Sequence, residues 1–316
     1  MTKKMIIDTD VGIDDAVAIL MALADPDWEI VGIAGVSGNV GLDHVMRNIC
    51  TVLDAVGADA IPVFRGADRP LLAQPHHAAS VHGDDGLGDV GFPATSHQIA
   101  REPAAQALVR LAREHPGATL VALGPLTNVA LAVALEPELP NLLGQTVLMG
   151  GAVHGLGNAS AVAEFNIYAD AEAAAMVFER GINPTVLSWE VTVETPILWE
   201  RWDHLVASGR IGRSFVAPMI EELAERTRER ERPGILMPDP LAMAAVLDPA
   251  SATSYTAVVD VDTGAGAARG MTAVNRRYYV NRPHNARIIA TIDQGRFEAL
   301  LERAFRLECR LLEQEV

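Results

Sequence analysis

The strongest constraint on the fold is the alternation of short apolar runs with helical patterns along most of the chain. Strands are predicted at residues 5–7, 29–36, 61–64, 119–123 and 146–149, and helices at 16–24, 42–56, 103–114 and after residue 127. This alternation is typical of βαβ units, and continuous apolar strands indicate burial on both faces of a sheet. The sequence therefore predicts an α/β fold with a mostly parallel, Rossmann-like open sheet and flanking helices.

The remaining segments fit the same single unit. Residues 74–97 hold four histidines, four glycines and three aspartates without a period, which predicts a long functional loop. A charged helix is predicted at 217–232, strands and hairpins at 254–285, and a closing helix at 294–315. Because no linker, repeat or low-complexity tract divides the chain, we expect one domain spanning residues 1–316.

Charge and hydropathy exclude two kinds of partner. Lys and Arg total 25 against 41 for Asp and Glu, a net charge of −16, so no basic surface is expected for nucleic acid. The longest apolar run, 16–24, is far shorter than the ~20 residues a membrane-spanning helix needs. No signal-peptide pattern opens the chain, and Cys50 and Cys309 are expected to be free, packed thiols. A cytoplasmic location is therefore predicted.

Four carboxylates lie within eight residues, where the first predicted strand gives way to a helix. They are Asp8, Asp10, Asp14 and Asp15. In open α/β sheets this edge is where ligands bind. One or two aspartates would cap the helix, but four so close together repel one another unless a cation or a set of donors compensates. Because oxygen ligands suit hard ions, the sequence predicts a Ca²⁺ or Mg²⁺ site.

The segment 8–15, D-T-D-V-G-I-D-D, resembles the signature of the inosine–uridine type nucleoside hydrolases. Further motifs follow in the family's order: V-S-G-N-V at 36–40, V-H-G at 81–83, L-G-P-L-T-N at 123–128, L-M-G-G at 148–151, A-E-F-N at 163–166 and D-P at 239–240. The resemblance is close from residue 5 to about 190 and sparser beyond. It implies the nucleoside hydrolase fold and Ca²⁺-dependent hydrolysis of a ribonucleoside to ribose and free base, in nucleoside salvage, by a homodimer or homotetramer.

The resemblance also implies a metal set and a general base. Asp10, Asp15 and Asp239 would supply carboxylate ligands and Leu123 a backbone carbonyl. The ion would hold the attacking water, from which Asp10 would take a proton. The sugar would pass through an oxocarbenium-like transition state, which a dense negative pocket stabilises.

A second implied set binds the substrate. Asp14 and Asn166 match residues that bind the 2′- and 3′-hydroxyls, Asn158 and Glu164 match those at the 5′-hydroxyl, and Asn39 matches one beside the anomeric carbon. The full expected set is Asp14, Asn39, Met149, Asn158, Glu164, Asn166 and Asp239. Asn39 and His82 are also expected to act in catalysis, His82 because histidine titrates in the useful range.

The chain departs from the family on the leaving-group side. Pro238 stands where members typically carry the histidine that protonates the base, and proline has no proton to give. Arg226 and Arg230 occupy the positions of two pocket tyrosines. Either they are surface partners of neighbouring glutamates, or they face the pocket and bind the leaving base or a substrate phosphate. Base preference is not fixed by the sequence.

Two other functions remain open at this stage. Asp8-x-Asp10 also resembles the haloacid-dehalogenase-type phosphatases, in which Asp8 would be the nucleophile and Mg²⁺ would assist. A non-catalytic, calcium-dependent nucleoside or ribose binder is the second. Two local patterns favour purely structural roles: Thr127 and Asn128 are expected to cap the following helix, and Trp189 to pack in the core.

Overall fold

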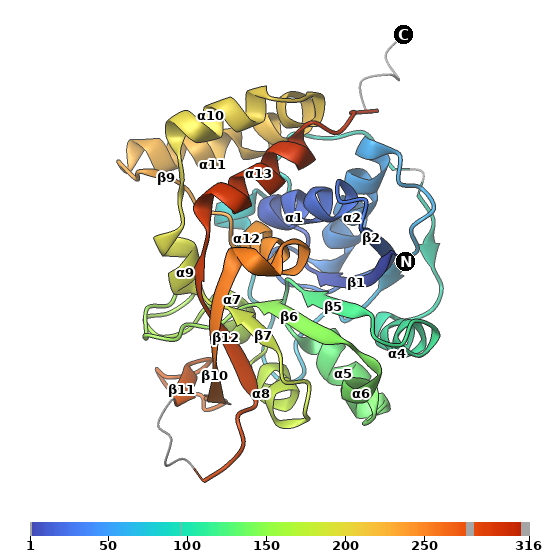
Figure 1. The fold of residues 1–316 in the computed structure, drawn as a ribbon, viewed down its shortest axis with the longest axis vertical. Helices are drawn as coiled ribbons and strands as arrows, with labels where there is room; N and C mark the ends of the chain where they lie inside the picture. Colours follow the sequence, from blue (N-terminus) through green and yellow to red (C-terminus); the bar gives the residue numbers. More distant parts are fainter. Residues whose placement is uncertain (1, 96, 276–280, 311–316) are drawn as a thin grey trace.

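A ten-stranded sheet forms the centre of the computed structural model, which describes residues 2–95, 97–275 and 281–310 (Figure 1). Its order is β11-β10-β12-β7-β6-β5-β1-β2-β3-β4. Neighbouring strands are parallel except that β10 runs antiparallel to both β11 and β12. The strands are β1 (Lys3–Thr9), β2 (Trp28–Gly35), β3 (Val63–Arg65), β4 (Ile99–Ala100), β5 (Thr119–Ala122), β6 (Gln145–Met149), β7 (Thr185–Leu187), β10 (Ala252–Val261), β11 (Thr272–Asn275) and β12 (Ala286–Ile292). The predicted mostly parallel α/β sheet is confirmed.

Helices cover both faces of this sheet (Figure 1). On one face lie α1 (Ile13–Leu23), α2 (Leu42–Val56), α12 (Pro238–Leu247) and α13 (Gln294–Phe305), and on the other lie α4 (Ala104–Glu114), α5 (Thr127–Leu135) and α8 (Ala171–Glu179). Side chains alternate along a strand, so Met5 and Ile7 of β1 join the core on the α1 face while Ile6 joins the core on the α5 face. The continuous apolar strands of the sequence are therefore buried on both sides.

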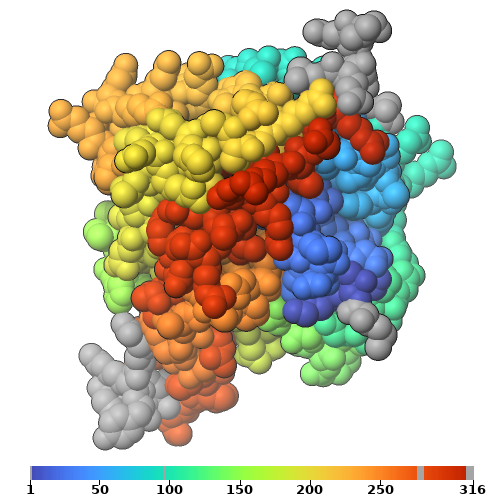
Figure 2. Space-filling view, turned by 45° about the horizontal axis from the view of Figure 1, so that its top comes forward, coloured from blue at the N-terminus to red at the C-terminus, as the bar shows by residue number. Residues whose placement is uncertain are grey.

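The other elements form the rim and the covering segments. They are α3 (Ala79–His82), α6 (Leu139–Leu142), α7 (Phe165–Ala169), α9 (Trp189–Glu194), α10 (Trp199–Ala207), α11 (Ala217–Glu229), a π-helical turn at Gly212–Val216, a 3₁₀ turn at Pro249–Ser251, and the antiparallel pair β8 (Ile197–Leu198) and β9 (Gly234–Ile235). Figure 2 shows α13 crossing one face of the molecule between α10 and the N-terminal helices, and α13 contacts both α10 and α1.

Helix ends depart from prediction where the chain makes distant contacts. The closing helix ends at Phe305 rather than continuing, and Arg310 then donates its backbone N–H to the carbonyl of Ala55 at 2.8 Å. This contact draws the chain toward the end of α2; positions 311–315 of the prediction lie outside the described residues. The charged helix α11 ends at Glu229, and the long loop contains the single short helix α3. Cys50 and Cys309 are both buried and free, as expected.

Candidate active site

The candidate site lies where the direction of strand addition reverses. From β1 the chain adds β2, β3 and β4 on one side, and then β5, β6 and β7 on the other. A crevice forms outside the carboxyl ends of the strands at such a switch point. Asp10 follows β1, Asn39 follows β2, Leu123 follows β5, and Met149 ends β6, so sequence-distant residues meet at one edge.

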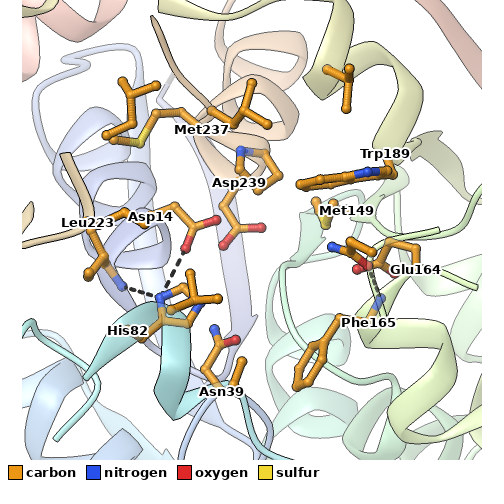
Figure 3. Close-up of a pocket in the computed structure, with 18 of the residues that line it drawn as sticks. Asp14, Asn39, His82, Met149, Glu164, Phe165, Trp189, Leu223, Met237 and Asp239 are labelled. Atoms are coloured by element: carbon orange, nitrogen blue, oxygen red, sulfur yellow. Dashed lines mark hydrogen bonds and ion pairs between the residues drawn. The ribbon is translucent and has the colours of Figure 1, made fainter. Parts of the chain in front are cut away.

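A cavity of about 790 Å³ opens at this edge (Figure 3). Four groups of residues surround it: the strand ends, the loop and short helix at 76–82, the segments around α7 and α9, and the segment from α11 to the start of α12. The predicted long loop therefore covers a cavity. In Figure 3, Asp14, Asn39 and Asp239 lie near the middle, His82 and Leu223 on one side, and Glu164 and Phe165 on the other.

Asp10 is fully buried behind the cavity and is closely enclosed. Its Oδ2 accepts the backbone N–H of Asn39 at 2.7 Å, while its Oδ1 has no hydrogen-bond partner among the described residues. A Cβ on Gly38 would lie 2.0 Å from Oδ2, and one on Gly124 would lie 2.7 Å from Oδ1. Both glycines are therefore needed so that backbone can approach the carboxylate.

Asp15 is fully buried and anchored by three donors. The Thr9 hydroxyl donates to Oδ1, and the Gly12 N–H (2.9 Å) and the Asn39 side-chain amide (3.1 Å) donate to Oδ2. These bonds fix Asp15 at the first turn of α1. Asp239 comes from the first turn of α12, so two helix N-termini direct carboxylates toward one point.

Asp14, Asp15 and Asp239 form a group whose carboxylate oxygens lie within 4.8 Å of one another. Burial, and then repulsion from the neighbouring carboxylates, raises the pKa of Asp10 and of Asp239 well above its usual range. Burial likewise raises the pKa of Asp14 to about 6 and raises that of Asp15. Protons or a cation must offset this charge, and a divalent ion would do so with oxygen ligands.

The expected metal set and this group overlap but differ. The group contains Asp15 and Asp239 together with Asp14, while Asp10 lies close enough to raise the pKa of Asp239 by its charge. The Leu123 carbonyl, the fourth expected ligand, accepts the Asn166 side-chain amide at 2.6 Å. A carbonyl oxygen has a second lone pair, so this bond leaves it one acceptor position.

The opposite wall brings together the residues expected at the sugar. The Asn166 amide also donates to the Met149 carbonyl at 3.1 Å, which orients it at the cavity edge. Glu164 is 1% exposed and accepts the N–H groups of Asn166, Gly151 and Ile167 at 2.9, 3.0 and 3.3 Å. Burial raises its pKa to about 7 despite these donors.

Asn158 has a structural partner as well as a place in the cavity lining. Its Oδ1 accepts the backbone N–H of Phe165 at 2.8 Å. This bond closes the loop before α7 against the helix start. The whole expected substrate set lines this cavity: Asp14, Asn39, Met149, Asn158, Glu164, Asn166 and Asp239.

His82 is buried beside the acidic cluster in a defined tautomer. Its Nδ1 accepts the backbone N–H of Ile13 at 3.1 Å and lies 3.8 Å from Asp14 Oδ1. Because Nδ1 accepts a hydrogen bond, the ring proton is on Nε2. Burial lowers the pKa of His82 to about 4, against an opposing effect of the Asp15 charge. The imidazole is therefore neutral near pH 7 and can only donate a hydrogen bond through Nε2.

The two arginines on α11 behave differently. Arg226 donates to the carbonyls of Ser80 and Val81 at 2.7 and 3.3 Å and so ties α11 to α3. Arg230, just past the end of α11, lines the cavity. Arg232 also lines it and was not singled out by the sequence, because nothing local distinguishes it from a surface cation.

Asp8 is separated from the cavity. It is fully buried, its Oδ1 accepts the Asn128 side-chain amide at 2.7 Å, and it is not among the residues that line the cavity. A carboxylate in this position cannot attack a phosphoryl group, which removes the structural basis for the phosphatase alternative. The same contacts show that the capping prediction was wrong: Asn128 binds Asp8, and the Thr127 hydroxyl donates to Asp170 at 2.6 Å.

Trp189 was expected to be a core residue, and that interpretation was incomplete. It packs against the core and also lines the cavity, near Met149 and Glu164 in Figure 3. Leu223 and Met237 are further lining residues that the sequence did not single out. Leu223 lies in a charged helix and Met237 follows a short apolar run, and neither pattern shows which residues border a cavity. No helix in the described part of the chain is long and apolar enough to cross a membrane.

Comparison with known proteins gives consistent matches along the chain. The family model described as inosine-uridine preferring nucleoside hydrolase matches residues 5–299. A Leishmania major protein named inosine-uridine preferring nucleoside hydrolase is 36% identical over 312 residues, covering 95% of this chain and 96% of that protein. The pyrimidine-specific ribonucleoside hydrolase RihA of Escherichia coli K12 is 34% identical, with 95% and 97% covered.

Solved structures agree with this result. A plant nucleoside hydrolase, the PpNRh1 enzyme, superposes with a TM-score of 0.91 at 32% identity, covering 96% of this chain and 99% of that chain. An inosine-guanosine nucleoside hydrolase gives a TM-score of 0.90 at 33% identity, with 96% and 98% covered. The named specificities of these relatives differ from one another.

Proposed function

Since the chain belongs to the inosine-uridine preferring nucleoside hydrolase family and is a hydrolase acting on N-glycosyl compounds, we propose that it cleaves ribonucleosides to ribose and free base in a Ca²⁺-dependent reaction. One observation carries the proposal: three buried carboxylates and the half-buried Asp14 converge where the expected sugar-binding residues meet in a single cavity. Nucleoside salvage in the cytoplasm would be its setting.

The residues at the acidic cluster fit a hard divalent cation. Oxygen atoms of three carboxylates lie within 4.8 Å of one another, and Oδ1 of Asp10 and of Asp14 have no hydrogen-bond partner among the described residues. We propose Asp10, Asp15, Asp239 and the Leu123 carbonyl as the ligands. A bound Ca²⁺ would acidify a water and orient the ribose diol through its positive charge.

The protein's own groups would then act as follows. Asp10 is the proposed general base, because it is buried beside the acidic cluster and its Oδ1 has no hydrogen-bond partner among the described residues. Asp14 and Asn166 would bind the 2′- and 3′-hydroxyls, and Asn158 and Glu164 the 5′-hydroxyl. These buried contacts would reject 2′-deoxyribosides, which leave a polar group unpaired.

The anomeric carbon would lie close to the carboxylates. As the N-glycosidic bond lengthens, positive charge develops on the sugar, and fixed negative groups stabilise it without reorganisation. Asn39 lies between Asp10 and Asp15, so its hydrogen bonds would hold both carboxylates in register with the sugar.

A reducing-sugar assay on ribonucleosides tests the proposal, with the full chain before and after chelation and after Ca²⁺ is restored. We expect chelation to abolish ribose release and Ca²⁺ to restore it. Asp10→Asn should lower kcat about 10²–10⁴-fold. Asp27→Asn is the matched control, because Asp27 is an exposed carboxylate at the opposite edge of the sheet, where its carbonyl accepts the Lys3 N–H.

Two results would contradict the proposal. Full hydrolysis by protein shown by elemental analysis to be free of Ca²⁺ would refute the metal dependence. Calorimetric binding of nucleosides without ribose release would instead support the calcium-dependent binder. Light scattering of the same preparation would test the proposed homodimer or homotetramer.

A further inference from the structure

Two arginines that line the cavity, Arg230 and Arg232, have no side-chain partner among the described residues, although their neighbours on α11 do. Arg226 binds two carbonyls of α3, and Arg228 pairs with Asp203 at 2.6 Å and stacks over Trp199 at 4.3 Å. For Arg230 and Arg232, no side-chain hydrogen bond or ion pair occurs within the described ranges. Both line the cavity.

The spacing along α11 directs Arg230 inward. Leu223, Thr227 and Arg230 line the cavity, and their separations of four and three residues place them on one helical face. Arg228 lies off this face and pairs with Asp203 of α10. Arg226 shares the face, but carbonyls of α3 accept its side-chain hydrogen bonds. The Arg230 guanidinium therefore faces a cavity that several carboxylates also line.

The position of Arg230 corresponds to the base of a bound nucleoside. If the ribose diol binds at the acidic cluster and its 5′ end at Glu164, the base must leave the anomeric carbon on the other side of the ring. Figure 3 places Leu223 and His82 on that other side, opposite Glu164 and Phe165. Arg230, the residue after the end of α11, lines the cavity on the same helical face as Leu223.

Among the described residues, this wall offers no acidic group to protonate a departing base. Besides the two arginines, the segment from α11 to α12 lines the cavity with Leu223, Thr227, Pro233, Gly234, Ile235, Leu236, Met237 and Pro238. His82 accepts the Ile13 N–H on Nδ1, so its only proton is on Nε2, and giving that proton up would leave an imidazolate. The base must therefore depart as an anion.

We propose that Arg230, supported by Arg232, binds the leaving base and stabilises the negative charge that it acquires as the N-glycosidic bond breaks. Arginine stays charged and presents a planar fork, which fits two acceptors on one edge of a base, such as O6 and N7 of a 6-oxopurine. Ribosides of oxo bases should then depend on Arg230 more than ribosides of amino bases do. This inference rests on the proposed function.

The step balances without an acid on the enzyme. The bond between C1′ and the base nitrogen breaks with both electrons going to nitrogen, and a water oxygen bonds to C1′. One proton of the water passes to Asp10 and the other stays on the new hydroxyl. The base anion takes a proton from solvent after release, and Asp10 returns its proton to solvent.

The test compares kcat/KM for wild type, Arg230→Ala and the control Arg228→Ala, on inosine, adenosine and 4-nitrophenyl riboside. We expect Arg230→Ala to lower kcat/KM for inosine about 10- to 100-fold, the range for a lost hydrogen bond to a charged group. The loss for adenosine should be smaller. For 4-nitrophenyl riboside it should be below about threefold, because nitrophenolate disperses its own charge. Arg228→Ala should behave as wild type.

Results other than these would contradict the proposed role of Arg230. Unchanged kcat/KM for inosine, or an equal loss on all three substrates, would overturn the role of Arg230 in an enzyme that still hydrolyses ribosides. With inosine 5′-phosphate as a fourth substrate, a loss of kcat/KM confined to that substrate would assign the arginine to a phosphate instead. If wild type releases ribose from none of the ribosides, the proposed function itself fails, and this inference fails with it. Equal thermal midpoints of the variants would show that each is folded.

Discussion

Replacing Glu164 by glutamine should change how the stability of the protein depends on pH. Glu164 is 1% exposed, and burial raises the pKa of its carboxyl from an ordinary value of 4.5 to about 7, although three backbone N–H groups donate to it. The folded state therefore binds a proton more tightly at this position than the unfolded state does. The stability this provides is complete below pH 4.5 and is lost as the pH rises through 7.

The size of the effect follows from the shift. Each pKa unit is worth about 1.36 kcal/mol, so Glu164 accounts for about 3 kcal/mol in total and about 2 kcal/mol between pH 5 and pH 8. In Glu164→Gln this titration is absent. The amide leaves at least one N–H donor unpaired at every pH, which costs about 1–3 kcal/mol. The variant should thus be clearly less stable than wild type at pH 5 and close to it at pH 8.

Thermal unfolding in saturating Ca²⁺ measures this difference, because the ion keeps the acidic cluster in the same state in both proteins. For a chain of this length, about 2 kcal/mol corresponds to a shift of about 3 °C. Glu172→Gln is the control: hydrogen bonding to Arg269 lowers the pKa of Glu172, so its titration lies below pH 5. If Glu164→Gln and wild type lost stability in parallel from pH 5 to pH 8, the reasoning would be refuted.

Close packing and buried hydrogen bonds around the acidic cluster give three more expected outcomes. Gly38→Ala should lower kcat about 100-fold or more, because its Cβ would lie 2.0 Å from Asp10 Oδ2, while the circular dichroism spectrum should not change. Gly41→Ala is the control and should retain kcat, because its Cβ would meet no atom within 4 Å. Asn128→Ala removes three buried hydrogen bonds and should lower the thermal midpoint by at least about 3 °C, and an unchanged midpoint would contradict this. Arg226→Ala removes the hydrogen bonds between α11 and α3, and steady-state kinetics should show a severalfold higher KM for a nucleoside with little change in kcat. An unchanged KM would show that this contact between α11 and α3 does not affect substrate binding.

The strand and helix pattern was predictable because it depends on local periodicity. The helix predicted at 42–56 matches α2, and the strand ends carry the residues that line the cavity. What local pattern could not supply was tertiary contact. Arg310 binds the carbonyl of Ala55, about 250 residues earlier, and the closing helix stops before it. Trp189 packs against the core and also lines the cavity. The shape of the cavity decides which face of the indole ring is covered, and local sequence does not show that shape.

The motifs predicted which residues gather at this edge of the sheet, but not how they divide between the cavity wall and the buried support behind it. Asp14 lines the cavity, whereas Asp10 and Asp15 lie behind the lining, although all three belong to one motif. Three donors fix Asp15, while Asp10 and Asp14 each keep an oxygen without a partner. Donors from Thr9, Gly12 and Asn39 decide which of these carboxylate oxygens are occupied. Asn39 lies outside the segment 8–15, so the aspartate motif alone does not show this.

Asp8 shows why the spacing of two aspartates cannot identify the chemistry. Asp8 and Asp10 have the same parity and would share one face of a continuing strand, as a D-x-D nucleophile motif requires. But β1 ends at Thr9, so Asp10 leaves the alternation and lies near Asp239 in the acidic cluster, while Asp8 keeps the parity of Ile6 and faces α5. There Asn128, 120 residues later, donates to it. The end of one strand and one buried amide thus separate this site from that of a phosphatase with an aspartate nucleophile at this position.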